Sequence, residues 1–91
     1  MREIPIKQAR EILKQALKGQ GNQRVALFTK KKDRSLTVVI QDEKLTLIEQ
    51  GYIDGTRVYR LGDSQAKHEL TNAFKREFPW SHQLYMSQVK E

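Results

Sequence analysis

Residues 36–50 read LTVVIQDEKLTLIEQ, two runs rich in Leu, Ile, Val and Thr around a short polar turn. Runs of this composition and length are typical of β-strands, and a turn this short joins antiparallel neighbours. We therefore expect strands at Leu36–Gln41 and Leu45–Gln50, connected by Asp42–Lys44. An antiparallel sheet is the element around which the rest of the chain must pack.

Two further strands extend this pair into a four-stranded meander. Arg24–Thr29 precedes the pair, and Arg57–Leu61 follows it after the hairpin signal Asp54-Gly55. Successive side chains in a strand point to opposite faces. The buried face is predicted to carry Val25, Leu27, Leu36, Val38, Ile40, Leu45 and Leu47, and the other face Thr37, Val39, Gln41, Thr46, Ile48 and Gln50. The second face is only half polar.

One amphipathic helix is predicted before the meander in the sequence and another after it. Pro5 is predicted at the first helical position, apolar residues then recur at three- and four-residue spacing from Ile6 to Leu17, and a glycine-containing loop follows. Gly62-Asp63-Ser64 supplies an N-cap for the second helix, which should end before Pro79 because the residue preceding a proline avoids helical dihedrals.

The tail from Trp80 to Glu91 fits a short final strand better than a helix, with loose attachment as the alternative. The predicted fold is thus a single α+β domain over residues 1–91: a helix, a four-stranded antiparallel meander, a helix and a possible short final strand.

Composition narrows the class of protein. The chain has 91 residues, which suits one domain, and it has no cysteine, which excludes disulfides and thiolate chemistry. Residues 1–6 reach charged side chains without an apolar run, and 18 consecutive apolar residues occur nowhere. We expect a cytoplasmic protein that does not enter membranes.

Positive charge is concentrated in the first third of the chain. Residues 1–34 hold ten Lys or Arg and three acidic residues, a net charge of +7, whereas residues 35–91 hold seven bases and eight acids, a net charge of −1. Such asymmetry is typical of a protein that meets an anionic partner on one side. Solubility alone is the competing explanation.

Two basic clusters in this third are candidate phosphate contacts. One is a stripe along the first helix, Lys7, Arg10, Lys14 and Lys18, and the other is the hairpin turn Lys30, Lys31, Lys32 and Arg34. When phosphates bind to such clusters, counterions are released to solution, and this release drives binding. Tyr59 between Arg57 and Arg60 is the candidate for base stacking on an open sheet face, whereas Phe28, Phe74, Phe78 and Trp80 are expected in the core.

Catalytic and metal-binding patterns are not recognised in the sequence. His68 and His82 have no partner at metal-ligand spacing, the aspartates fall at predicted turns or caps, and the glycines form no nucleotide-binding loop. We predict no cofactor, no metal and no enzymatic activity. A small ribonuclease acting through Arg, Lys, His and Tyr has no spacing signature and stays an open alternative.

The order of helix, antiparallel sheet and helix resembles double-stranded RNA-binding domains and the Alu-RNA-binding subunits of the signal recognition particle. The second helix opens Ser64-Gln65-Ala66-Lys67-His68-Glu69, without the lysine-rich start of the former, and the strand around Val58 and the extension past Pro79 depart from the latter. The likeness is one of topology, and a fold does not fix a function.

Two functions follow as hypotheses. The first is a non-catalytic module that binds RNA, or the backbone of duplex DNA, through phosphate contacts, with RNA favoured over DNA. The second is a protein-interaction or regulatory module that pairs through the half-apolar sheet face, with a homodimer as one form. The first requires the two basic clusters to form one continuous surface in the folded protein.

Overall fold

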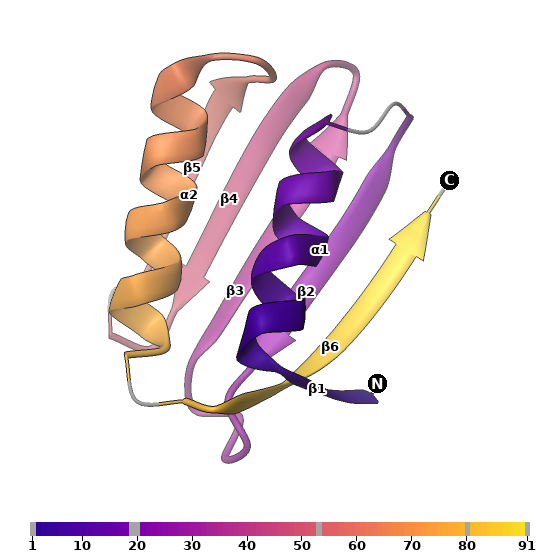
Figure 1. The fold of residues 1–91 in the computed structure, drawn as a ribbon. Coiled ribbons are helices and arrows are strands. Elements are labelled where there is room, and N and C mark those ends of the chain that lie inside the picture. The colour runs from indigo at the N-terminus through magenta and orange to yellow at the C-terminus, as the bar shows by residue number, and fades with distance from the viewer. Residues whose placement is uncertain (1, 19–20, 53, 80, 91) are drawn as a thin grey trace.

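The computed structural model describes residues 2–18, 21–52, 54–79 and 81–90, and this part of the chain forms one antiparallel sheet of six strands with two helices on one face (Figure 1). The strands lie in the order β1-β6-β2-β3-β4-β5. In chain order the elements are β1 (Arg2–Pro5), α1 (Ile6–Lys18), β2 (Gln23–Phe28), β3 (Ser35–Gln41), β4 (Lys44–Gln50), β5 (Gly55–Arg60), α2 (Ser64–Glu77) and β6 (Gln83–Lys90). The predicted α+β class is confirmed.

The strand count was underestimated, because the meander is only part of the sheet. Strands β2 to β5 form the predicted meander, and β6 pairs with the free edge of β2, with Met86 opposite Leu27. Strand β1 then pairs with β6, with Ile4 opposite Leu84. The final strand favoured for the tail therefore exists, and it lies inside the sheet between two neighbours. Strand β1 was missed because its four residues contain a single buried side chain, Ile4, which makes no pattern.

The two helices begin and end close to where the sequence placed them. Helix α1 buries Ala9, Leu13 and Ala16, and the backbone amide of Ile6 at its start donates to the carbonyl of His82, 2.9 Å away, just before β6. Helix α2 is capped by Asp63, whose carboxylate accepts a hydrogen bond from the amide of Gln65 at 2.9 Å. It ends ahead of Pro79, as expected.

The core lies between the sheet and the helices. Helix α1 packs against β1, β6 and β2, and α2 packs against β3, β4 and β5, so each helix covers one half of the same sheet face. All seven side chains predicted for the buried face are in the core, where they meet residues of the helices and of β6. The face with Thr37, Val39, Thr46 and Ile48 carries no helix (Figure 1). The predicted division of the sheet into two faces is confirmed.

A buried ionic cluster fixes the end of α2 on the sheet. The side chain of Glu49 in β4 is 1% exposed, and its two oxygens accept hydrogen bonds of 2.7 Å each from Nε and Nη2 of Arg76 in α2. Nη2 of Arg57 approaches the same carboxylate at 3.1 Å. Burial acts to raise the pKa of Glu49, but hydrogen bonding with Arg76 and Glu77 and the charges of both arginines outweigh it, so this pKa is lowered. Glu49 is therefore held as a carboxylate beneath α2.

Candidate nucleic-acid interface

A groove runs between α1 and α2 on the side of the molecule away from the sheet. Its volume is about 600 Å³. Its apolar lining comes from Leu13 and Leu17 of α1 and from Ala66, Leu70 and Phe74 of α2. Most of these side chains are buried, so they form the floor, while longer polar side chains form the walls. We call this feature the inter-helix groove.

The α1 wall of the groove carries three of the four cations predicted as a stripe. Arg10, Lys14 and Lys18 recur every four residues and therefore lie on one side of the helix. The guanidinium carbon of Arg10 lies 5.5 Å from the centre of the Phe74 ring, which holds this side chain over the floor. Nζ of Lys14 lies 3.8 Å from the Glu11 carboxylate, an exposed pair of little energetic weight. Lys7 is exposed on α1 and does not line the groove.

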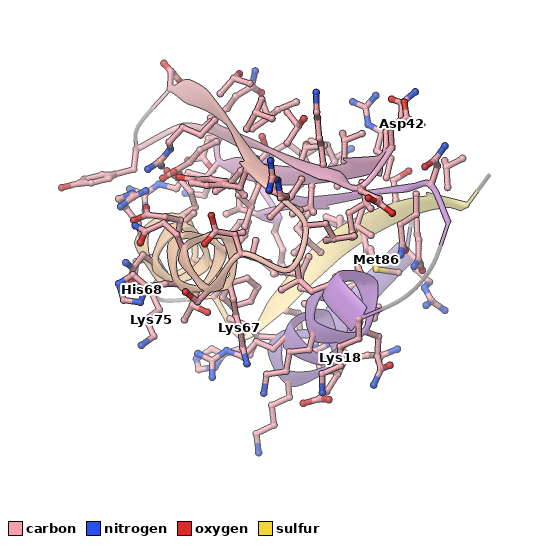
Figure 2. All side chains as sticks on the ribbon, turned by 90° about the horizontal axis from the view of Figure 1, so that it is seen from above. Lys18, Asp42, Lys67, His68, Lys75 and Met86 are labelled. Atoms are coloured by element: carbon pink, nitrogen blue, oxygen red, sulfur yellow. The ribbon has the colours of Figure 1, made fainter. Side chains whose placement is uncertain are left out.

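The α2 wall adds two cations that the sequence prediction missed. Lys67 and Lys75 line the same groove, with Thr71 between them. Figure 2 shows Lys67 on the side of α2 toward α1, and Lys75 further round the helix beside His68, so that Lys75 reaches the groove from its outer edge. Both lysines belong to the nearly neutral part of the sequence, where local charge gives no signal. The signal that could have found them is their eight-residue separation, which is close to two helical turns and places both lysines toward one side of α2.

The charge of the groove is strongly one-sided. Its lining includes five cations, Arg10, Lys14, Lys18, Lys67 and Lys75, against a single acid, Asp63. The Asp63 carboxylate already accepts the cap hydrogen bond from Gln65. Among the described residues, Lys18, Lys67 and Lys75 form no ion pair. A concave site lined by one sign of charge concentrates ligands of the opposite sign.

The predicted basic turn lies elsewhere, so the two clusters do not form one surface. Nζ of Lys32 lies 5.8 Å from the centre of the Tyr85 ring, and the register places Tyr85 beside Phe28 on the face without helices. Nζ of Lys30 is 3.9 Å from the Glu3 carboxylate. The continuous basic surface on which the first hypothesis depends is not formed by these two clusters, because Lys30 and Lys32 reach toward the sheet face opposite the helices.

Several local contacts also hold the turn against its neighbours. The Asp33 carboxylate accepts a 2.7 Å hydrogen bond from the Thr29 hydroxyl, which lowers the pKa of Asp33. The Arg34 guanidinium carbon lies 5.8 Å from the centre of the Tyr52 ring. A Cβ on Gly51 would lie only 2.7 Å from Cγ of Arg34, so the turn packs tightly against the start of the next connection. Lys31 is exposed.

The three candidates on β5 are divided between the two faces. Arg57 points under α2, where Nη1 lies 3.1 Å from Glu69 and Nη2 lies 3.1 Å from Glu49, so its charge is neutralised. Tyr59 packs against the core and is not on the open face. Arg60 is exposed on the open face, in register with Lys44. Strand alternation placed an arginine and a tyrosine inward that sequence reasoning had assigned outward.

The open sheet face carries its own mixture of side chains. Phe28, expected in the core, is half-buried on this face opposite Tyr85. Phe74 and Phe78 are in the core as predicted, and Trp80 lies outside the described residues. Val58 and Val89 are 60% and 54% exposed at the two ends of one cross-strand row, which also contains Arg24. This face is apolar in part, and it is basic rather than acidic at its polar positions.

The two histidines lie on different segments of the fold. His68 and His82 are both exposed, on α2 and just before β6. Within the described ranges, no three His, Asp or Glu side chains converge as a metal site would require. None of the helices in the described part of the chain is both long and apolar enough to cross a membrane.

Comparison of the chain with protein-family models, with curated proteins and with solved structures finds no match.

Proposed function

We propose that the protein is a non-catalytic nucleic-acid-binding module that contacts phosphates with the cations of the inter-helix groove. The proposal rests on one observation: cations from two helices line the same concave surface. They are Arg10, Lys14 and Lys18 of α1 and Lys67 and Lys75 of α2. The hairpin turn of residues 30–34 reaches toward the other sheet face, so the continuous surface that the sequence hypothesis required is not formed, and the present proposal rests on the groove cations alone.

The electrostatics of the groove favour a polyanion over a single small anion. Five cations spread along two helix walls face several positions on a ligand, which a chain of phosphates matches and a lone carboxylate does not. Each phosphate contact releases condensed counterions, so affinity falls linearly with salt on a log-log scale. Four of the five cations are lysines, which bind phosphates as point charges, so the proposed recognition rests on the backbone.

Salt dependence of binding tests the proposal. In the groove variant, Lys14, Lys18 and Lys67 are all replaced by Gln; in the matched control, Lys30, Lys31 and Lys32 are. Both sets are exposed and remove the same charge. We expect the groove variant to lower the slope of log affinity against log salt by about two to three, at about 0.7–0.9 for each contact. The hairpin control should leave the slope within about one of the original.

The reverse ranking would contradict the assignment to the groove. If the hairpin variant lowered the slope and the groove variant did not, the contact would lie on the open-face side of the sheet. Circular dichroism checks that both variants keep the fold, which we expect because neither triple removes a buried side chain.

A second candidate is protein interaction through the open sheet face. The favouring observation is the exposure of Val58 and Val89, with half-buried Val39 and Ile48 on the same face. Arg24, Lys44 and Arg60 also lie there, so two copies would set cations against cations, which makes this the weaker candidate for self-pairing. Sedimentation velocity at high protein concentration decides it: a strictly monomeric protein at all concentrations contradicts the homodimer.

A further inference from the structure

We infer that the protein associates with a second copy of itself through strand β5, edge to edge, so that the two sheets become one. In the sheet formed by the described residues, β5 has a neighbour on one side only, β4. The backbone donors and acceptors on its other side are available to a further strand. This contact differs from pairing through the open sheet face, and it does not depend on the proposed function.

Every second residue of β5 directs its backbone groups away from β4. The amide of Leu61 donates to the carbonyl of Glu43 at 2.8 Å, which fixes the phase of the alternation along the paired strands. In an antiparallel pair, hydrogen-bonded residues alternate with residues whose amide and carbonyl point to the other side of the strand. On β5 the outward residues are Thr56, Val58 and Arg60. In the described part of the chain, a partner for these groups is found only at the Arg60 carbonyl, which accepts from the Asp63 amide at 3.1 Å.

Strand β5 lacks the features that usually protect a sheet edge. The register of Gly55–Arg60 with β4 is continuous, without a bulge, and no proline interrupts it. Arg57 points toward the helices, and an inward charge can prevent pairing, but Glu49 and Glu69 each lie 3.1 Å from this guanidinium and neutralise it. The opposite edge is different, because β1 has four residues and ends at Pro5, which has no amide hydrogen. Of the two edges, β5 is the one suited to a partner.

One antiparallel register makes β5 complementary to itself. Placing Val58 opposite the partner's Val58 lets the amide of each donate to the carbonyl of the other. The same register sets Thr56 opposite the partner's Arg60, whose amide can donate to the free Thr56 carbonyl. The exposed Val58 side chains then meet across the twofold axis, apolar against apolar. On the helical face, Arg57 lies opposite the partner's Tyr59, beside an aromatic ring instead of a cation.

Charge opposes this register less than it opposes pairing through the open face. Each Arg60 lies opposite the partner's Thr56, so the two Arg60 side chains are offset by four residues, about 14 Å along the strands. This separation exceeds the Debye length of about 8 Å at physiological ionic strength. A net charge of +6 on each copy still repels the other copy. We therefore expect the association to strengthen as salt is raised, whereas phosphate binding weakens.

Edge-to-edge pairing leaves the helices of both copies on one face. Both helices of a single copy lie on the same sheet face (Figure 1), and a twofold axis perpendicular to the sheet preserves that face. The two inter-helix grooves therefore open in the same direction. Such a dimer presents two cationic grooves to one polyanion, which raises its avidity, and this consequence alone rests on the proposed function.

Sedimentation velocity of the full-length protein, without nucleic acid, measures the association. We expect a monomer at about 10 µM and a growing dimer fraction toward about 1 mM, because an edge contact is small and gives a weak Kd. The dimer fraction should rise when salt is increased from about 0.1 M to about 0.5 M. A strictly monomeric protein at about 1 mM and about 0.5 M salt would overturn the inference. The phosphate contacts would stand, since the salt slope of nucleic-acid binding tests them separately.

Proline variants show whether the free backbone edge is used. Val58→Pro removes the amide of the central hydrogen bonds but no bond to β4, so it should weaken the association about tenfold or more. Glu3→Pro is the matched control, because the alternation along β1 also directs the Glu3 amide away from its neighbour, at the opposite edge. It should leave the association within about twofold. Equal association of Val58→Pro and the original protein would overturn the inference.

Charged variants test the register and keep the backbone amide, so they decide the question if the proline variant does not fold. Val58→Lys sets two lysines opposite each other and should abolish the association. Val89→Lys, at the other exposed valine of the open face, should not. An equimolar mixture of Val58→Lys and Val58→Glu should associate again, because opposite charges then meet across the axis. Equal loss in both lysine variants would place the contact on the open face, and no recovery in the mixture would exclude Val58 from the axis; either result overturns the inference.

Discussion

Replacing Arg76 with Met should expose the energetic role of the buried ionic cluster. The substitution keeps an unbranched side chain on α2 but removes both 2.7 Å hydrogen bonds to Glu49, whose side chain is 1% exposed. Breaking a buried pair by removing one partner costs about 3–5 kcal/mol, because a charge is left buried without compensation. Arg57 remains 3.1 Å from the same carboxylate, so we expect the lower end, about 3 kcal/mol.

Urea denaturation followed by circular dichroism measures this loss. A domain of this size has a total stability of about 5–14 kcal/mol, so the expected loss is a large part of it. With an m-value of about 1 kcal/mol/M, the midpoint should fall by about 3 M. Lys75→Met, at the exposed neighbouring position, is the matched control and should change stability by less than about 0.5 kcal/mol.

A double variant, Glu49→Leu with Arg76→Met, refines the reasoning. Replacing both charges with apolar groups removes the uncompensated carboxylate, so the double variant should be more stable than Arg76→Met alone. Arg57 keeps its other partner, Glu69, at 3.1 Å. If Arg76→Met were no less stable than the Lys75→Met control, or if the double variant were the least stable of all, the cluster would not be what fixes α2 on the sheet.

Three further predictions concern stability. The pKa of Glu49 is lowered in the folded protein, so the ionised carboxylate stabilises the fold at pH values above the ordinary glutamate pKa of 4.5. This contribution is lost as the pH falls from 4.5 through the lowered pKa. The difference in unfolding free energy between the protein and Glu49→Gln should therefore shrink as the pH is lowered over this range. Gly51→Ala should cost more than about 1 kcal/mol, since φ is +123° and the new Cβ would meet the 30–34 turn, whereas Gly62→Ala, at φ +94° in open space, should cost less; both are measured by urea denaturation. Asp63→Ala should remove the α2 cap and lower the melting temperature by about 4–8 °C, for a loss of about 1 kcal/mol.

Local pattern was enough to predict most of the fold. Helices α1 and α2 and strands β2 to β4 could be recognised because each contains several apolar residues at the period of its element and is bounded by a glycine, a proline or a polar turn. Strand β5 was located by the hairpin signal Asp54-Gly55 before it. The short strand β1 carries one buried residue and depends on β6 for every backbone partner, so it has no pattern of its own. Its pairing joins residues about 80 positions apart, which no local signal reports.

Of the two walls of the inter-helix groove, only the cations of the α1 wall could be predicted from the sequence. Arg10, Lys14 and Lys18 share a helix, and their spacing alone places them on one side. Their meeting with Lys67 depends on how α1 and α2 lie on the sheet, which is a tertiary property. The same limit explains Arg57, whose inward position follows from the pairing of β5 with β4 and from the presence of Glu49 on the same face.

The most direct measurement is a map of amide chemical-shift changes in the 15N-labelled protein as a short RNA is added. The largest changes are expected along the two walls of the groove, at Lys14 and Lys18 of α1 and at Lys67 and Thr71 of α2, with small changes on the open sheet face. Changes concentrated instead around Phe28 and Tyr85, with the helices unaffected, would contradict the assignment of the phosphate contacts to the inter-helix groove.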